Sequence, residues 1–124
     1  MNKKILLLGL NIFIIVFLTG CFTLTPIISL AQVDEIEIVI LETFPVQVQV
    51  IAKGNLPDPC TEISEIIQER EGNDFSINIK TYRPPGFCIQ VLTPFEEIIN
   101  LELLGLPAGI YTVDVNGITG TFKL

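Results

Sequence analysis

Strict alternation of apolar and polar residues is the feature that most constrains this chain. Residues 46–50 read Val-Gln-Val-Gln-Val, so a strand would place the valines on one face and the glutamines on the other. A helix would scatter the same valines around its circumference. Comparable alternation recurs in four further segments, 35–40, 75–80, 111–116 and 118–124. The sequence therefore predicts a series of half-buried strands.

Turn residues separate these segments at short intervals. Asn116-Gly117 is a strong hairpin signal, because both residues tolerate the positive φ of a type I′ turn. Residues 70–74 read as a second hairpin loop, and residues 54–59 as a turn-rich connection. About seven short strands, with turns every eight to twelve residues, predict an all-β fold, a single antiparallel β-sandwich.

Two stretches are less regular. Within 61–69 the isoleucines have helical spacing, so a short helix is the alternative to a strand there. A strand is favoured, because the hairpin loop that follows needs one on each side. After an interruption at 83–86, extended structure is expected at 89–92 and again at 96–103, with Thr93-Pro94 as a break between them.

A basic and then apolar segment precedes the strands. Lys3 and Lys4 lead into an apolar run over 5–18, which is short for a spanning helix but suits the h-region of a secretory signal. The next residues, Leu18-Thr19-Gly20-Cys21, match the lipobox of bacterial lipoprotein signal peptides. In proteins of that kind the cysteine receives a diacylglycerol and the chain is cut just before it. The resemblance implies a signal peptide at 1–20 and lipidation of Cys21.

Two alternatives to lipidation remain open. Ser29-Leu30-Ala31 has the small residues of an ordinary signal-peptidase site, so the chain could be secreted after cleavage near Ala31. A retained anchor helix over 5–31 is the other alternative, although Gly20 and Pro26 argue against one continuous helix. All three interpretations place the rest of the chain outside the cytoplasm. With a lipid anchor, residues 21–34 would be a tether and 35–124 the folded domain.

Acidic side chains dominate the chain after Cys21. All 14 Asp and Glu residues follow it, against five Lys and Arg, which gives this part a net charge of −9. Such a protein repels phosphate backbones and anionic lipid head groups. The sequence therefore excludes nucleic acid as a partner.

Two cysteines remain once Cys21 is assigned to the anchor. Cys60 and Cys88 form an even pair, and in an oxidising compartment a disulfide is expected. Two isolated thiols in a chain without histidine cannot complete a usual zinc site. The Cys-x-x-Cys spacing of a reactive thiol pair is also absent.

A motif near the C-terminus carries a resemblance in fold. Residues 106–115 resemble the strand entry of bacterial immunoglobulin-like and fibronectin-III-like domains, in which a Leu-Pro-x-Gly turn precedes a strand that begins with Tyr. The resemblance implies that the Tyr111 hydroxyl bonds back to the turn backbone and that Phe122 is a core residue. It also implies an immunoglobulin-like sandwich of the kind found in small bacterial lipoproteins. No reaction is implied, because sandwiches host unrelated activities.

Groups suited to catalysis are few. The chain has no histidine, and none of its three serines lies in a nucleophile-elbow motif. Glu96 and Glu97 are adjacent, so on a strand their carboxylates face opposite sides. Residues 114–117 resemble the start of a calcium loop without the later ligands, and a hairpin explains them better. We therefore expect no enzyme activity, cofactor or metal, and the sequence identifies no small-molecule substrate.

One loop has the composition of a binding surface. Residues 82–87 place two aromatics, one cation and a stiff diproline next to the expected disulfide. Rigid loops of this composition are typical of interaction hot spots, because docking costs them little entropy. The candidate partner-binding residues are Tyr82, Arg83, Pro84, Pro85 and Phe87. The simpler interpretation is that Phe87 covers the disulfide and Arg83 pairs with a neighbouring Glu.

These features predict a lipid-anchored, extracytoplasmic immunoglobulin-like module. It would have a binding or structural role at the cell envelope, with an envelope protein as the partner of the loop. The alternative is an inhibitor or chaperone-like partner of an envelope enzyme, acting through the same loop, residues 82–87.

Overall fold

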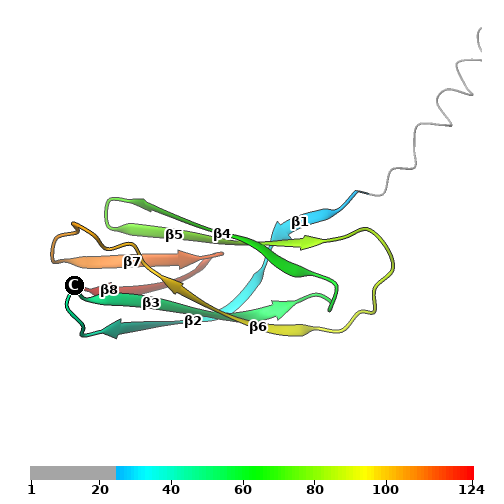
Figure 1. The fold of residues 1–124 in the computed structure, drawn as a ribbon, viewed down its shortest axis with the longest axis horizontal. Coiled ribbons are helices and arrows are strands. Elements are labelled where there is room, and N and C mark those ends of the chain that lie inside the picture. The colour runs from blue at the N-terminus through cyan, green and yellow to red at the C-terminus, as the bar shows by residue number, and fades with distance from the viewer. Residues whose placement is uncertain (1–24) are drawn as a thin grey trace, which may run out of the picture.

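A computed structural model describes residues 25–124, which form two β-sheets (Figure 1). The strands of this part are β1 (Ile27–Leu30), β2 (Gln32–Leu41), β3 (Gln47–Leu56), β4 (Glu62–Glu71), β5 (Asp74–Arg83), β6 (Thr93–Asn100), β7 (Ile110–Val115) and β8 (Ile118–Lys123). The predicted all-β sandwich is confirmed, with eight strands. No helix within 25–124 combines the length and apolar character needed to cross a membrane. Cys21 and the expected signal or anchor helix lie outside the described residues.

The first sheet is organised around β5. One edge of β5 pairs with β4 from Asp74 to Tyr82. The other edge is shared, because β1 pairs with Lys80–Arg83 and β7 with Asp74–Ile77. β8 completes this sheet beside β7, and the second sheet has the order β2-β3-β6.

One strand pair departs from the predicted antiparallel pattern. β5 and β7 run parallel, whereas every other pair in the described part is antiparallel. After β5 the chain passes into β6 of the second sheet and returns to the first sheet as β7. Such a crossover permits a parallel pair, which a hairpin cannot form. The prediction of a wholly antiparallel sandwich is therefore wrong at this pair.

Side-chain alternation builds the core as expected. The inward residues of β5 and β7 are almost fully buried, as are Val48 and Val50 of β3. Three aromatic rings gather among them: the ring centroid of Phe75 lies 6.1 Å from that of Tyr111 and 6.0 Å from that of Phe122. The Tyr111 and Phe122 rings stack at 5.5 Å. The expected core position of Phe122 is confirmed.

Both predicted hairpin turns form. β4 and β5 are joined across Gly72 and Asn73, and β7 and β8 across Asn116 and Gly117. Asn116 has φ 49° and Gly117 φ 95°, the positive values that the sequence predicts. The stretch 61–69 belongs to a strand, β4. The short helix is therefore excluded.

Asn116 also fills a gap in the first sheet. Its side chain lies where the shared edge of β5 passes from β7 to β1. Ile79 N–H donates to Asn116 Oδ1 at 2.8 Å, and Asn116 Nδ2 donates to the carbonyls of Ala31 at 2.7 Å and Ile79 at 3.0 Å. One side-chain amide thus replaces a missing strand partner at this point.

Three expectations along the chain are corrected. Residues 27–34, placed in the tether, form β1 and the start of β2. Residues 89–92 form no strand, and Thr93-Pro94 begins β6 instead of breaking it. Gly54 to Leu56 continue β3 instead of turning, because Gly54 serves a close approach: a Cβ there would lie 1.9 Å from the Gln32 carbonyl oxygen.

Candidate functional site

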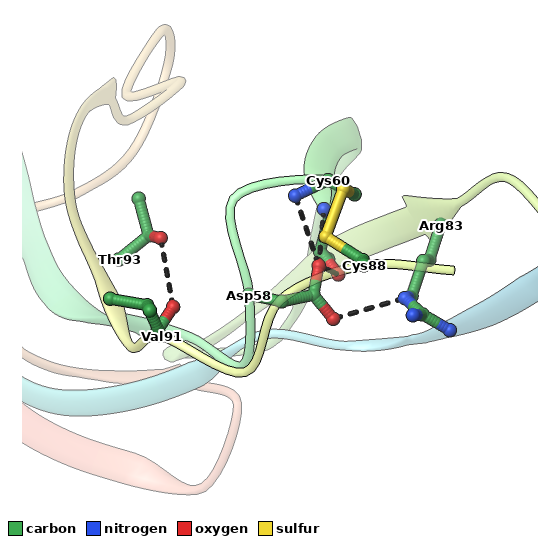
Figure 2. Close-up of a disulfide and its surroundings, with 7 residues drawn as sticks. Asp58, Cys60, Arg83, Cys88, Val91 and Thr93 are labelled. Atoms are coloured by element: carbon green, nitrogen blue, oxygen red, sulfur yellow. Dashed lines mark hydrogen bonds and ion pairs between the residues drawn. A yellow bond between two sulfur atoms is a disulfide. The ribbon is translucent and has the colours of Figure 1, made fainter. Parts of the chain in front are cut away.

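A disulfide joins two loops at one end of the sandwich. Cys60 follows β3 and Cys88 follows β5, and their sulfur atoms are bonded, with 6.3 Å between the Cα atoms (Figure 2). The predicted disulfide is confirmed. It ties the 84–92 loop, which connects β5 to β6, to the 57–61 loop, which connects β3 to β4.

Asp58 organises the shorter of the two loops. Its side chain is only 3% exposed. Oδ1 accepts hydrogen bonds from the Thr61 N–H at 2.8 Å, the Thr61 hydroxyl at 2.9 Å and the Cys60 N–H at 3.0 Å. Burial alone would raise the pKa of Asp58, but the bonds from Thr61, the Arg83 charge and the bond from Cys60 together hold this pKa below its usual value. Asp58 is therefore an ionised anchor of the loop backbone.

Arg83 lies against Asp58 on the inner side of the disulfide end. Its Nε is 3.0 Å from Asp58 Oδ2, and its side chain is 21% exposed (Figure 2). The contact is an ion pair and not a hydrogen bond, because the buried Nε–H does not point at an acceptor within the described residues. Arg83 pairs within the molecule, as the simpler interpretation expected, but its partner is an Asp and not a Glu.

Phe87, in contrast to Arg83, is almost fully exposed to solvent. Its side chain is 96% exposed, so it does not cover the disulfide, in which Cys88 is buried and Cys60 is exposed. Pro84 and Pro85 are exposed as well, and Tyr82 is half-buried on β5. The structure thus separates the candidate binding residues: Arg83 faces inward, and the diproline and Phe87 face solvent.

Further apolar side chains are exposed at the same end, and sequence reasoning missed them. Ile89 and Leu92 follow Phe87 in the loop, and β1 contributes others beside Arg83, its register partner being Ile27. We call this surface the apolar end; it comprises Ile27, Ile28, Leu30, Phe87, Ile89 and Leu92. One feature of the sequence could have indicated this surface: residues 84–93 contain no charged side chain.

The acidic groups of the described part do not assemble a metal site. Asp58 lies within 4.8 Å of both cysteine sulfurs, but these are bonded to each other and offer no thiolate. Asp114 accepts a hydrogen bond from the Gly117 N–H at 2.8 Å, and the Asn116 amide is occupied by β5. The hairpin thus uses the groups that suggested a calcium loop.

A polar groove of about 680 Å³ follows the outer face of β5, β7 and β8. Asp74 and Asp114 line it together with three threonines. The Thr112 hydroxyl donates a hydrogen bond to Asp74, so this carboxylate is engaged within the sheet. The groove therefore presents carboxylates and hydroxyls on the surface of the sheet.

Comparison with known proteins adds a family. The sequence model of the family described as the ORF11 beta-sandwich domain matches residues 50–124. An uncharacterized 10.2 kDa protein in the HgiCIIM 5′ region of Herpetosiphon aurantiacus is 37% identical over 94 residues, 75% of this chain and 99% of that relative. A second one, in the HgiBIM 5′ region of the same organism, is 37% identical over 83 residues, 66% of this chain and 100% of that relative. No solved structure matches the chain.

Proposed function

The chain belongs to the family of ORF11 β-sandwich domains, and we propose that its sandwich is a lipid-anchored, extracytoplasmic module with a binding or structural role at the cell envelope. The bonded pair Cys60–Cys88 is the observation that carries this proposal. Disulfides persist outside the cytoplasm and are rare within it. Together with the lipobox at 18–21, the disulfide supports export and anchoring through Cys21.

Tyr111 supports an immunoglobulin-like or fibronectin-III-like character for the sandwich. Its hydroxyl donates a hydrogen bond to the Pro107 carbonyl oxygen at 2.5 Å, four residues upstream. This is the tyrosine-corner arrangement that the Leu-Pro-x-Gly motif led us to expect.

The apolar end is the proposed contact surface of the module. Large patches of exposed apolar side chains are typical of interaction sites. Two prolines and the disulfide stiffen the 84–92 loop, so docking costs it little conformational entropy. The alternative, an inhibitor or chaperone-like partner of an envelope enzyme acting through residues 82–87, is less favoured, because Arg83 of that loop pairs with Asp58.

Fractionation of bacteria that express the full chain tests the anchoring. We expect wild-type protein in the membrane fraction, with a diacylglycerol mass on the peptide that begins at Cys21 and no free thiol on Cys60 or Cys88. Cys21→Ser should leave the membrane fraction. The matched control, Cys60→Ala with Cys88→Ala, keeps Cys21 and should stay in it. Wild-type chain in the cytosol with three free thiols would overturn the proposal.

A further inference from the structure

Exposed apolar residues from two distant parts of the sequence meet at one end of the sandwich. β1 enters the first sheet with Ile27 opposite Arg83, and the 84–92 loop begins immediately after Arg83. Figure 1 shows β1 and this loop at the same end, with the β2–β3 connection at the other. The side chains of the apolar end are each more than half exposed. Burying them would release a substantial hydrophobic free energy.

This end carries almost no charge in an acidic molecule. Residues 25–31 and 84–93 contain no Asp, Glu, Lys or Arg. Two cations of β5 lie beside β1: Arg83 is paired with Asp58, and Lys80 lies opposite Leu30 at the border of the surface. Glu62, opposite Tyr82 on β4, borders the surface. An apolar surface whose charges lie only at its border suits an apolar occupant.

The described part of the chain begins at this surface. Ile27, the first residue of β1, follows Cys21 by only six positions. Fully extended, six residues span at most about 20 Å. An acyl chain on Cys21 would therefore hold the apolar end close to the bilayer that contains it.

We propose that the apolar end docks onto the phospholipid bilayer that receives the Cys21 anchor, with Phe87 entering the region between head groups and acyl chains. This inference rests on the proposed function, since only an anchored chain is held at a membrane. Apolar side chains at such interfaces are buried about 5–10 Å into the head-group boundary. The stiff loop and β1 would then fix the sandwich end-on to the membrane, with the β2–β3 connection pointing away.

Tryptophan fluorescence tests the docking directly, because the chain contains no tryptophan. Phe87→Trp places a probe in the apolar end. The matched control is Phe44→Trp, a fully exposed position in the β2–β3 connection at the far end. Both full-length, lipidated chains are reconstituted into phosphatidylcholine vesicles, with and without bromine atoms on the acyl chains. We expect bromine to lower Phe87→Trp emission at least about twofold and to leave Phe44→Trp unchanged, because only a side chain inserted at the head-group and acyl-chain boundary comes close to the brominated chains.

Each other outcome is decisive. If Cys21 carries lipid and the chain floats with the vesicles, but bromine quenches both variants equally or neither, the docking is overturned and the anchoring stands. If Phe87→Trp emission changes with protein concentration and not with bromine, a second copy or another protein covers the apolar end, which also overturns the docking. If Cys21 carries no lipid and the chain stays in the aqueous fraction, the proposed function and the docking fail together.

Discussion

Asn116 and Asp58 each satisfy backbone groups that no strand reaches. Asn116 occupies the shared edge of β5, where β7 has ended and β1 has not begun. Asp58 collects two backbone N–H groups and a hydroxyl in the loop that precedes β4. Buried backbone groups left without such partners cost free energy, so single side chains hold together regions that the sheets leave open.

Asn116 has two roles, the positive φ of the turn and the side-chain hydrogen bonds to the backbone, and Asn116→Gly separates them. Glycine keeps the positive φ of the turn but removes three side-chain hydrogen bonds. We expect a loss of about 2 kcal/mol in the free energy of unfolding, measured by urea denaturation. Asn73→Gly, the same change in the β4–β5 turn, removes a single bond and should cost less. A neutral Asn116→Gly would show that the residue acts only through its turn conformation.

Asp58 makes stability depend on pH at the acidic end. Its folded pKa lies below the usual 3.8, so its ionisation stabilises the fold above that pH and the contribution is lost as pH falls through the folded pKa. Asp58→Asn should be less stable than wild type near neutral pH, and the difference should shrink below pH 3.8. Urea midpoints across this range measure it. Glu37→Gln, at an exposed position, should follow the wild-type curve, and a constant gap for Asp58→Asn would contradict the prediction.

Among the elements, the strands with one buried and one solvated face could be predicted from the sequence. Alternation in β3, β5 and β7 is a direct record of the two faces of a strand. Gly54 was misread because close approach of two backbones and a turn both require glycine, and only the position of Gln32 distinguishes them. Residues 89–92 were misread because apolar residues in a short run predict burial, whereas here they are exposed.

The disulfide stabilises the fold by joining the 57–61 and 84–92 loops. It closes a chain segment with a sequence separation of 28. In the chain-entropy description, such a crosslink contributes about 3–4 kcal/mol to the free energy of unfolding. Cys60→Ala with Cys88→Ala should lose this amount in urea denaturation and should no longer respond to a reducing agent. Wild-type protein that unfolds identically with and without reductant would contradict the prediction.

At the scale of the molecule, the candidate site was only partly predictable. The cysteine pair and the exposed diproline loop could be read from the residues, because compartment and composition carry that information. The pairing of Arg83 with Asp58 and the arrival of β1 beside the loop could not. The arrival of β1 depends on a strand pairing between residues more than fifty positions apart, such as Ile27 and Arg83. The ion pair joins the end of β5 to the loop before β4, and nothing local in the chain records either contact.

The net charge of the protein should make the docking depend on lipid charge and on salt concentration. The part of the chain after Cys21 carries −9, so a bilayer with anionic head groups repels the body of the sandwich while the apolar end is attracted. Bromine quenching of Phe87→Trp should therefore be weaker in anionic vesicles than in phosphatidylcholine at low salt. Salt should restore it, because screening shortens the repulsion to about 10 Å at 0.1 M. Stronger quenching in anionic vesicles would show that cations, and not apolar side chains, dominate the contact.

The placement of β1 has a mechanical consequence. The chain enters at the end that holds the 84–92 loop, and the C-terminus lies at the opposite end (Figure 1). A pulling force between a membrane and a partner bound to the C-terminus would therefore act along the strands. β1 is antiparallel to β5, and its hydrogen bonds lie across that direction, so they would be sheared together instead of being peeled one at a time. The four-residue strand β1 would thus resist extension of the chain.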